Sequence, residues 1–167
     1  MPPLKDKLVG IVALLFVTLV IFWSWILFQG VTSGPINNLF GLLYPSISLF
    51  GAVVGIFIVS KRWGGWNSVI GRGILLLSLG LLGEVFGQLS WSYFAIIRQV
   101  DIPYPSIADI GYFSIIPFYG YAMYNFAKAA GVKVNLRTLL GKVQAVIIPL
   151  GMIAIAYALF LKDVEIE

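Results

Sequence analysis

The 167-residue sequence is 60% hydrophobic and 11% charged, with a mean hydropathy of +0.98. Because soluble domains carry about 25% charged residues, we expect this protein to be surrounded by a lipid bilayer. Its net charge of +4 arises from basic residues that flank hydrophobic segments, a distribution that does not indicate a nucleic-acid partner. The sequence contains no Cys and no His, which excludes disulfides, thiolate or histidine metal sites, and Ser-His or Cys-His catalysis.

Five hydrophobic segments follow one another along the chain, each about as long as a helix that crosses a bilayer. We expect transmembrane helices over residues 8–28, 39–60, 69–97, 107–130 and 137–161. Pro45 falls in the first turns of the second segment, where the loss of its backbone N–H is tolerable. The short connections predict an all-α polytopic membrane protein, a single domain over 1–167, in which consecutive helices pack antiparallel.

The basic residues are distributed unequally between the two expected sides of the membrane. Nine of the 11 Lys and Arg residues fall at the N-terminus or near the connections after the second and fourth segments. They are Lys5, Lys7, Lys61, Arg62, Arg72, Lys128, Lys133, Arg137 and Lys142. Arg98 and Lys162 fall on the other side. Because cytoplasmic loops are enriched in basic residues, we expect a multi-pass protein of the cell (plasma) membrane, with its N-terminus in the cytoplasm and its C-terminus outside.

The third segment carries polar residues near its middle. Glu84, Gln88 and Trp91 lie on one helical face, which also holds the glycines of a stripe expected to form a packing groove, Gly73, Gly80 and Gly87. A carboxyl group in lipid is costly, so this face is a candidate intramembrane polar site, and its helix is expected at the centre of the bundle. Glu84 has two interpretations: an interhelical hydrogen bond, or a ligand, ion or proton site. The candidate partners for the bond are Gln88, Ser46, Ser48, Tyr119 and Tyr124.

A proline-rich turn precedes the fourth segment. Ser106 is followed three residues later by Asp109, which is the spacing of a capping box at a helix start. A second interpretation is an outer-facing ligand or ion site that includes Arg98 and Asp101. The candidate residues for this loop site or helix cap are Pro105, Ser106, Asp109 and Tyr112.

The same region resembles a known family. Gly87-Gln88, Trp91, Tyr93, the P-x-P-S-x-A-D-x-x-Y pattern from Pro103 to Tyr112, and Pro117 are similar to the N-terminal multi-helix membrane sensor domains of prokaryotic GGDEF and EAL signalling proteins and of sensor histidine kinases. The resemblance covers about residues 80–121 and implies signal reception in the membrane, with an undefined ligand. Family members usually have more spans and a cytoplasmic output domain. This chain is therefore expected to be a stand-alone relative or a fragment without its own output domain.

The expected function is a non-enzymatic sensory or signalling module. No Walker A, GxGxxG or HExxH pattern occurs, and we expect no cofactor and no metal. The expected partners are the lipid bilayer, a membrane or cytoplasmic signalling protein, and a second copy of the chain. Two alternatives remain: a small transporter or ion-pathway subunit centred on Glu84, and a structural subunit of a membrane complex.

Overall fold

The structure is a computed structural model that describes residues 2–30, 33–100, 103, 105–131, 143, 147, 150–152, 154 and 155. It divides into two units, Met1–Ala129 and Ala130–Glu167. The first unit is helical, with no strand among its described residues. In the second unit, residues 143, 147, 150–152, 154 and 155 are helical, and most of the predicted fifth span, 137–161, lies outside the described residues.

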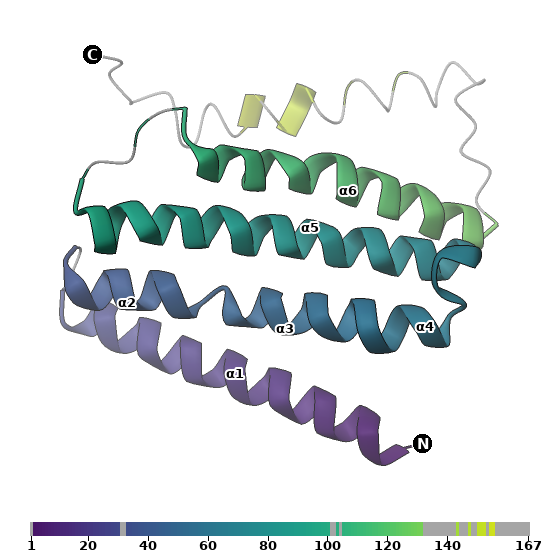
Figure 1. Ribbon diagram of the computed structural model, residues 1–167, viewed down its shortest axis with the longest axis horizontal. Coiled ribbons are helices and arrows are strands. Elements are labelled where there is room, and N and C mark those ends of the chain that lie inside the picture. Colours follow the sequence, from purple (N-terminus) through teal and green to yellow (C-terminus); the bar gives the residue numbers. More distant parts are fainter. Residues whose placement is uncertain are drawn as a thin grey trace. The chain divides into compact units, whose positions relative to one another are not determined.

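The first unit contains four helical rods that run side by side (Figure 1). The first is α1 (Pro2–Phe28), and the third is α5 (Val69–Ser92) with the π-helical η3 (Tyr93–Arg98). The fourth is α6 (Ile107–Ala129). The second rod comprises, in chain order, α2 (Pro35–Leu43), α3 (Ser46–Val54), the π-helical η1 (Gly55–Val59) and α4 (Ser60–Arg62). The short 3-10 helix η2 (Gly65–Asn67) connects this rod to α5.

Three of these helical stretches are long and apolar enough to cross a membrane. They are Lys7–Phe28, Pro35–Arg62 and Val69–Arg98. Helix α6 has 23 residues, which corresponds to about 35 Å at about 1.5 Å per residue, but its tyrosines and Asp109 make it less apolar than the other three. The all-α class is therefore confirmed for the described residues.

The second rod begins earlier than expected, and this changes the role of one proline. Helix α2 starts at Pro35, a first-turn position where the missing N–H and fixed φ of proline suit a helix, so the prediction of a start at residue 39 was wrong. Pro45 consequently lies in the middle of the rod and not in its first turns. It has no N–H to donate and its ring crowds the preceding turn, and the rod is interrupted there between α2 and α3.

Glycines bring α5 and α6 into close antiparallel contact. A side chain added at Gly73, Gly80 or Gly87 would meet the rings of Phe126, Tyr119 and Tyr112, respectively. The expected glycine groove of the third helix is thus confirmed, and α6 covers it. At Gly111 the two backbones touch: an added Cβ would lie 2.5 Å from the Gly87 nitrogen and 2.6 Å from the Gly83 oxygen.

The other face of α5 packs on the second rod. An added Cβ at Gly55 would collide with the Ser78 hydroxyl, and one at Gly51 would lie 3.2 Å from a Leu81 methyl. Helix α5 therefore lies between the second rod and α6, as expected for a central third helix. Helix α1 is much less enclosed, although Ile26 near its end is only 3% exposed.

Candidate functional site

Glu84 lies in the middle of α5 and contacts the second rod. It is 12 residues from Arg72 and 14 from Arg98, which places it about 18 Å and 21 Å from them along the helix. The Ser48 hydroxyl of α3 donates a 2.8 Å hydrogen bond to Glu84 Oε2. Ser48 is one of the partners expected for this carboxyl group.

Gln88, one helical turn further along α5, joins three helices. Its side chain is only 7% exposed. Its Oε1 accepts hydrogen bonds from the Tyr44 hydroxyl at 2.9 Å and from the Tyr112 hydroxyl at 2.8 Å. Its Nε2 donates to the Gly41 carbonyl at 3.1 Å. One amide therefore connects α2, the turn after it, α5 and α6.

The Gly41 carbonyl is available to Gln88 because of Pro45. In an α-helix, the carbonyl of residue 41 accepts from the N–H of residue 45, and proline has none. A buried carbonyl without a donor is costly. The Gln88 amide supplies the missing hydrogen bond, so the interruption of the second rod and the position of Gln88 form one structural feature.

Trp91 lies beside the same helix interruption. A Cβ built on Gly41 would be 3.6 Å from the Trp91 ring and 3.4 Å from Gln88 Nε2. Glycine at position 41 thus allows the amide and the indole to reach the backbone of α2. The three residues predicted as an intramembrane site lie along the contact between α5 and the second rod. Glu84 accepts a hydrogen bond from Ser48, and Gln88 and Trp91 lie beside Gly41.

The candidate residues of the loop divide between two places. Asp109 Oδ2 accepts a 2.6 Å hydrogen bond from the Ser106 backbone N–H, which is the carboxylate half of the predicted capping box. The carboxylate also suits the positive end of the α6 dipole. Pro105 is exposed beside this cap. Asp101, which the ligand-site interpretation requires, lies outside the described residues.

Tyr112 belongs with Gln88 and not with the loop, because its hydroxyl donates a hydrogen bond to Gln88 Oε1. We define the polar cluster as the Gly41 carbonyl with the side chains of Tyr44, Ser48, Glu84, Gln88 and Tyr112. It connects the two sets of candidate residues that had been treated as separate sites.

Two members of the polar cluster were missed in the sequence. Gly41 and Tyr44 stand in an apolar stretch with no polar periodicity. Pro45 was the available signal, because a proline inside a helix frees the carbonyl four residues before it. Recognising that signal required placing the helix start at Pro35.

The polar cluster offers one carboxyl, one amide, hydroxyls and a backbone carbonyl. These groups hold helices together and provide oxygen acceptors for a proton, a cation or a polar ligand. No group of three or more His, Cys, Asp or Glu side chains that could hold a metal ion occurs in the described part of the chain.

Comparisons of the chain with protein-family models, curated proteins and solved structures find no match. The resemblance to prokaryotic membrane sensor domains therefore stays a prediction based on the motif residues around Gln88 and Asp109. What the protein does is therefore inferred from the geometry of the polar cluster and from the length and apolar composition of the helices.

Proposed function

We propose that the chain is an integral membrane sensory module in which the polar cluster is the element that responds to the signal. The observation that carries this proposal is the bond from Gln88 to the Gly41 carbonyl. At the interruption of the second rod, a side chain from another helix replaces a backbone donor. A bond of this kind is broken when α2 moves relative to α5, whereas a backbone bond inside a helix moves with its helix.

The proposed membrane arrangement follows from the packing of the first unit. Helix α5 is long and apolar enough to cross a membrane, and α6 runs antiparallel to it from the Gly73–Phe126 contact to the Gly87–Tyr112 contact. A helix packed along this length of a spanning helix crosses with it. We therefore propose α6 as a fourth span and residues 137–161 as a fifth, in the plasma membrane, with the N-terminus in the cytoplasm.

Signal transmission requires an element with two arrangements whose populations a ligand or the bilayer changes. In the proposed module, one arrangement keeps the Gln88–Gly41 bond and the other opens it at Pro45. The rod that contains Pro45 ends in two basic residues, Lys61 and Arg62. A cytoplasmic output protein would read the movement there or at the basic connection after α6.

Disulfide trapping tests this proposal, and the absence of native Cys makes introduced pairs unambiguous. Leu42 and Leu89 border one cavity between α2 and α5, so a Leu42→Cys, Leu89→Cys pair reports the seam. Phe86 and Ile107 border another between α5 and α6, and their Cys pair is the matched control. Oxidation rates are measured in proteoliposomes while bilayer thickness, lipid charge, ionic strength and pH are changed one at a time.

A sensor should show a condition that changes the rate at the α2–α5 pair and not at the control pair. In a Gln88→Leu background, the α2–α5 rate should no longer depend on that condition. Equal rates under all conditions, with and without Gln88, contradict the proposal.

A second function is favoured by one observation, the carboxyl of Glu84 about midway along α5. An ion pathway at this position predicts a proton or cation flux in liposomes that Glu84→Gln abolishes. Such a flux would replace the sensory proposal, and the same liposomes used for trapping serve for its measurement.

A further inference from the structure

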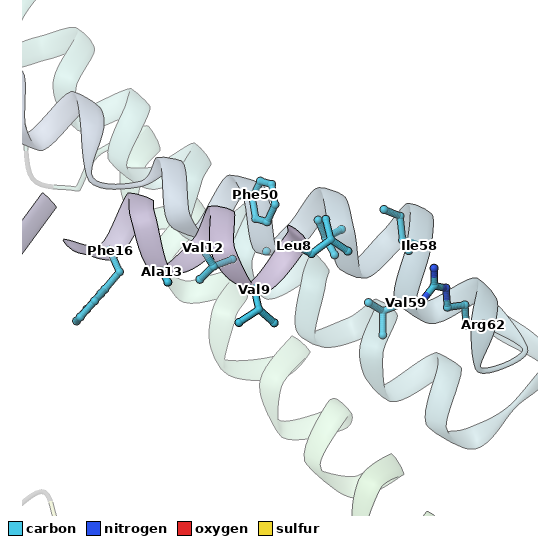
Figure 2. A pocket seen from close by; sticks show the side chains of 11 residues that line it. Leu8, Val9, Val12, Ala13, Phe16, Phe50, Ile58, Val59 and Arg62 are labelled. Atoms are coloured by element: carbon cyan, nitrogen blue, oxygen red, sulfur yellow. The ribbon is translucent and has the colours of Figure 1, made fainter. Parts of the chain in front are cut away.

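A groove of about 540 Å³ lies between α1 and the second rod, away from the polar cluster. On α1 it extends from Leu8 to Phe16, and on the second rod from Phe50 to Arg62. Figure 2 shows Phe16 at one end and Arg62 at the other. Of the residues that line it, all but Arg62 are apolar or glycine.

The dimensions of the groove match one leaflet of a bilayer. From Phe50 to Arg62 the second rod advances 12 residues, which is about 18 Å at about 1.5 Å per residue. Half of the hydrocarbon core of a bilayer is about 15 Å. The groove therefore extends from the basic end of the second rod to about the middle of the membrane, as the acyl chain of a phospholipid does.

Two small residues leave room along this groove. Gly51 has no side chain and lies close to Leu81 of α5, and Ala13 contributes only a methyl group from α1. Helix α1 also separates from the second rod toward its N-terminal end (Figure 1). Arg62 lies at the end of the second rod, where a lipid headgroup would lie.

The charge at this end selects the chemistry of the occupant. Arg62 lines the groove, and Lys61 beside it has its ammonium 5.8 Å from the centre of the Phe57 ring. Lys7 is exposed in the early turns of α1. A guanidinium binds phosphate oxygens with two parallel hydrogen bonds, and basic residues at a membrane surface attract anionic lipids.

We propose that the groove is a binding site for one anionic phospholipid. An acyl chain lies between α1 and the second rod, and the headgroup phosphate is bound by Arg62. Phosphatidylglycerol is the appropriate probe, because it carries the phosphate without the compensating cation of phosphatidylcholine.

Native mass spectrometry of the full chain, released from mild detergent with equal amounts of phosphatidylglycerol and phosphatidylcholine, tests the proposal. The wild type should retain one phosphatidylglycerol in preference to phosphatidylcholine. Arg62→Gln should weaken that binding by about tenfold, the factor expected when a hydrogen bond to a charged group is lost. Lys61→Gln is the matched control; it removes the same charge one residue away from the lining and should weaken binding by less than about twofold.

A second variant tests the apolar part of the site. Ala13→Trp fills the groove from an exposed position of α1 and should prevent retention while the thermal midpoint stays close to that of the wild type. Equal retention of both lipids, equal effects of Arg62→Gln and Lys61→Gln, or normal retention by Ala13→Trp would each overturn the proposal.

The identity of the occupant is checked in membranes. A photo-reactive benzoylphenylalanine at Val12, which lines the groove, should form an adduct with the mass of an anionic phospholipid. An adduct with a second copy of the chain, or with a peptide of the same chain, would show that protein occupies the groove and would also overturn the proposal.

Discussion

The seam between α5 and α6 and the seam between α1 and the second rod are built in opposite ways. Along the first, glycines face aromatic rings, and at Gly111 the two backbones meet. Along the second, α1 diverges from the second rod, and a groove of about 540 Å³ remains. Since there is no hydrophobic driving force between helices in lipid, van der Waals contact and hydrogen bonds decide which pairs associate firmly. Close contacts of glycines with rings and backbone therefore mark the firmly packed part of the first unit, and the groove marks the loosely packed part.

The largest loss of stability is expected for a substitution at the contact between α5 and α6. Gly111→Ala adds a Cβ 2.5 Å from the Gly87 nitrogen and 2.6 Å from the Gly83 oxygen, and backbone atoms cannot rotate away. We expect a loss of about 3 kcal/mol in unfolding free energy, the upper end for overpacking. Gly120→Ala in the same helix is the control, because nothing lies within 4 Å of its added Cβ, and it should be neutral or stabilising by up to about 1 kcal/mol. Reversible unfolding in mixed detergent measures both; equal effects would show that the seam is loose.

The next largest effect is expected in the polar cluster, whose hydrogen bonds connect α5 and α6 to α2 and the turn after it. Gln88→Leu removes three hydrogen bonds, and at about 0.6 kcal/mol for each bond in a membrane protein the expected loss is about 2 kcal/mol. Pro45→Ala restores a backbone donor for the Gly41 carbonyl.

The cost of Gln88→Leu should therefore be smaller in the Pro45→Ala background, and a double-mutant cycle measures this difference. Strictly additive effects would mean that Gln88 does not substitute for the missing N–H of Pro45.

A smaller effect is expected where a single bond connects α3 to α5. Ser48→Ala removes the donor to Glu84 Oε2 and should cost about 0.6 kcal/mol. Glu84→Gln keeps a side-chain oxygen that can accept from Ser48, so it should be nearly neutral for unfolding in the same detergent system. A large loss of stability for Glu84→Gln would indicate that the carboxylate has a further partner that an amide does not satisfy.

The smallest change in stability is expected on α1, which packs loosely on the second rod. Leu14 on α1 is 69% exposed, so Leu14→Ala should change the unfolding free energy by less than about 0.5 kcal/mol. Ile26 on the same helix is 3% exposed, and Ile26→Ala should cost clearly more because it removes packed contacts. If Leu14→Ala proves as costly as Ile26→Ala, α1 is enclosed by something else in the membrane.

Features that depend on local sequence were predictable. Hydropathy predicted the helical stretches of the first unit, apart from the start of the second. The spacing of Gly73, Gly80 and Gly87 predicted a packing face, and Ser106 with Asp109 predicted a helix start. These signals are properties of one helix or one turn. Ser48 appeared among several partners for Glu84, because composition identifies hydroxyl groups but not the register between helices.

The remaining features depend on how helices align. Tyr112 was predicted to belong to the loop site or helix cap, and only the α5–α6 register places its hydroxyl on Gln88. The Gly41 carbonyl became a site residue only once Pro45 was recognised as internal to a rod. The groove beside Arg62 results from the divergence of two helices, which no residue pattern in either one specifies.

The hydrogen bond between the Gln88 amide and the Gly41 carbonyl should couple substitutions at positions 45 and 88, which are far apart in the sequence. A lineage that replaces Pro45 regains the backbone donor, after which the Gly41 carbonyl no longer depends on the amide at position 88. A lineage that loses the amide first leaves the buried Gly41 carbonyl without this donor. Substitutions at positions 45 and 88 should therefore covary in divergent sequences, with loss of the proline coming first.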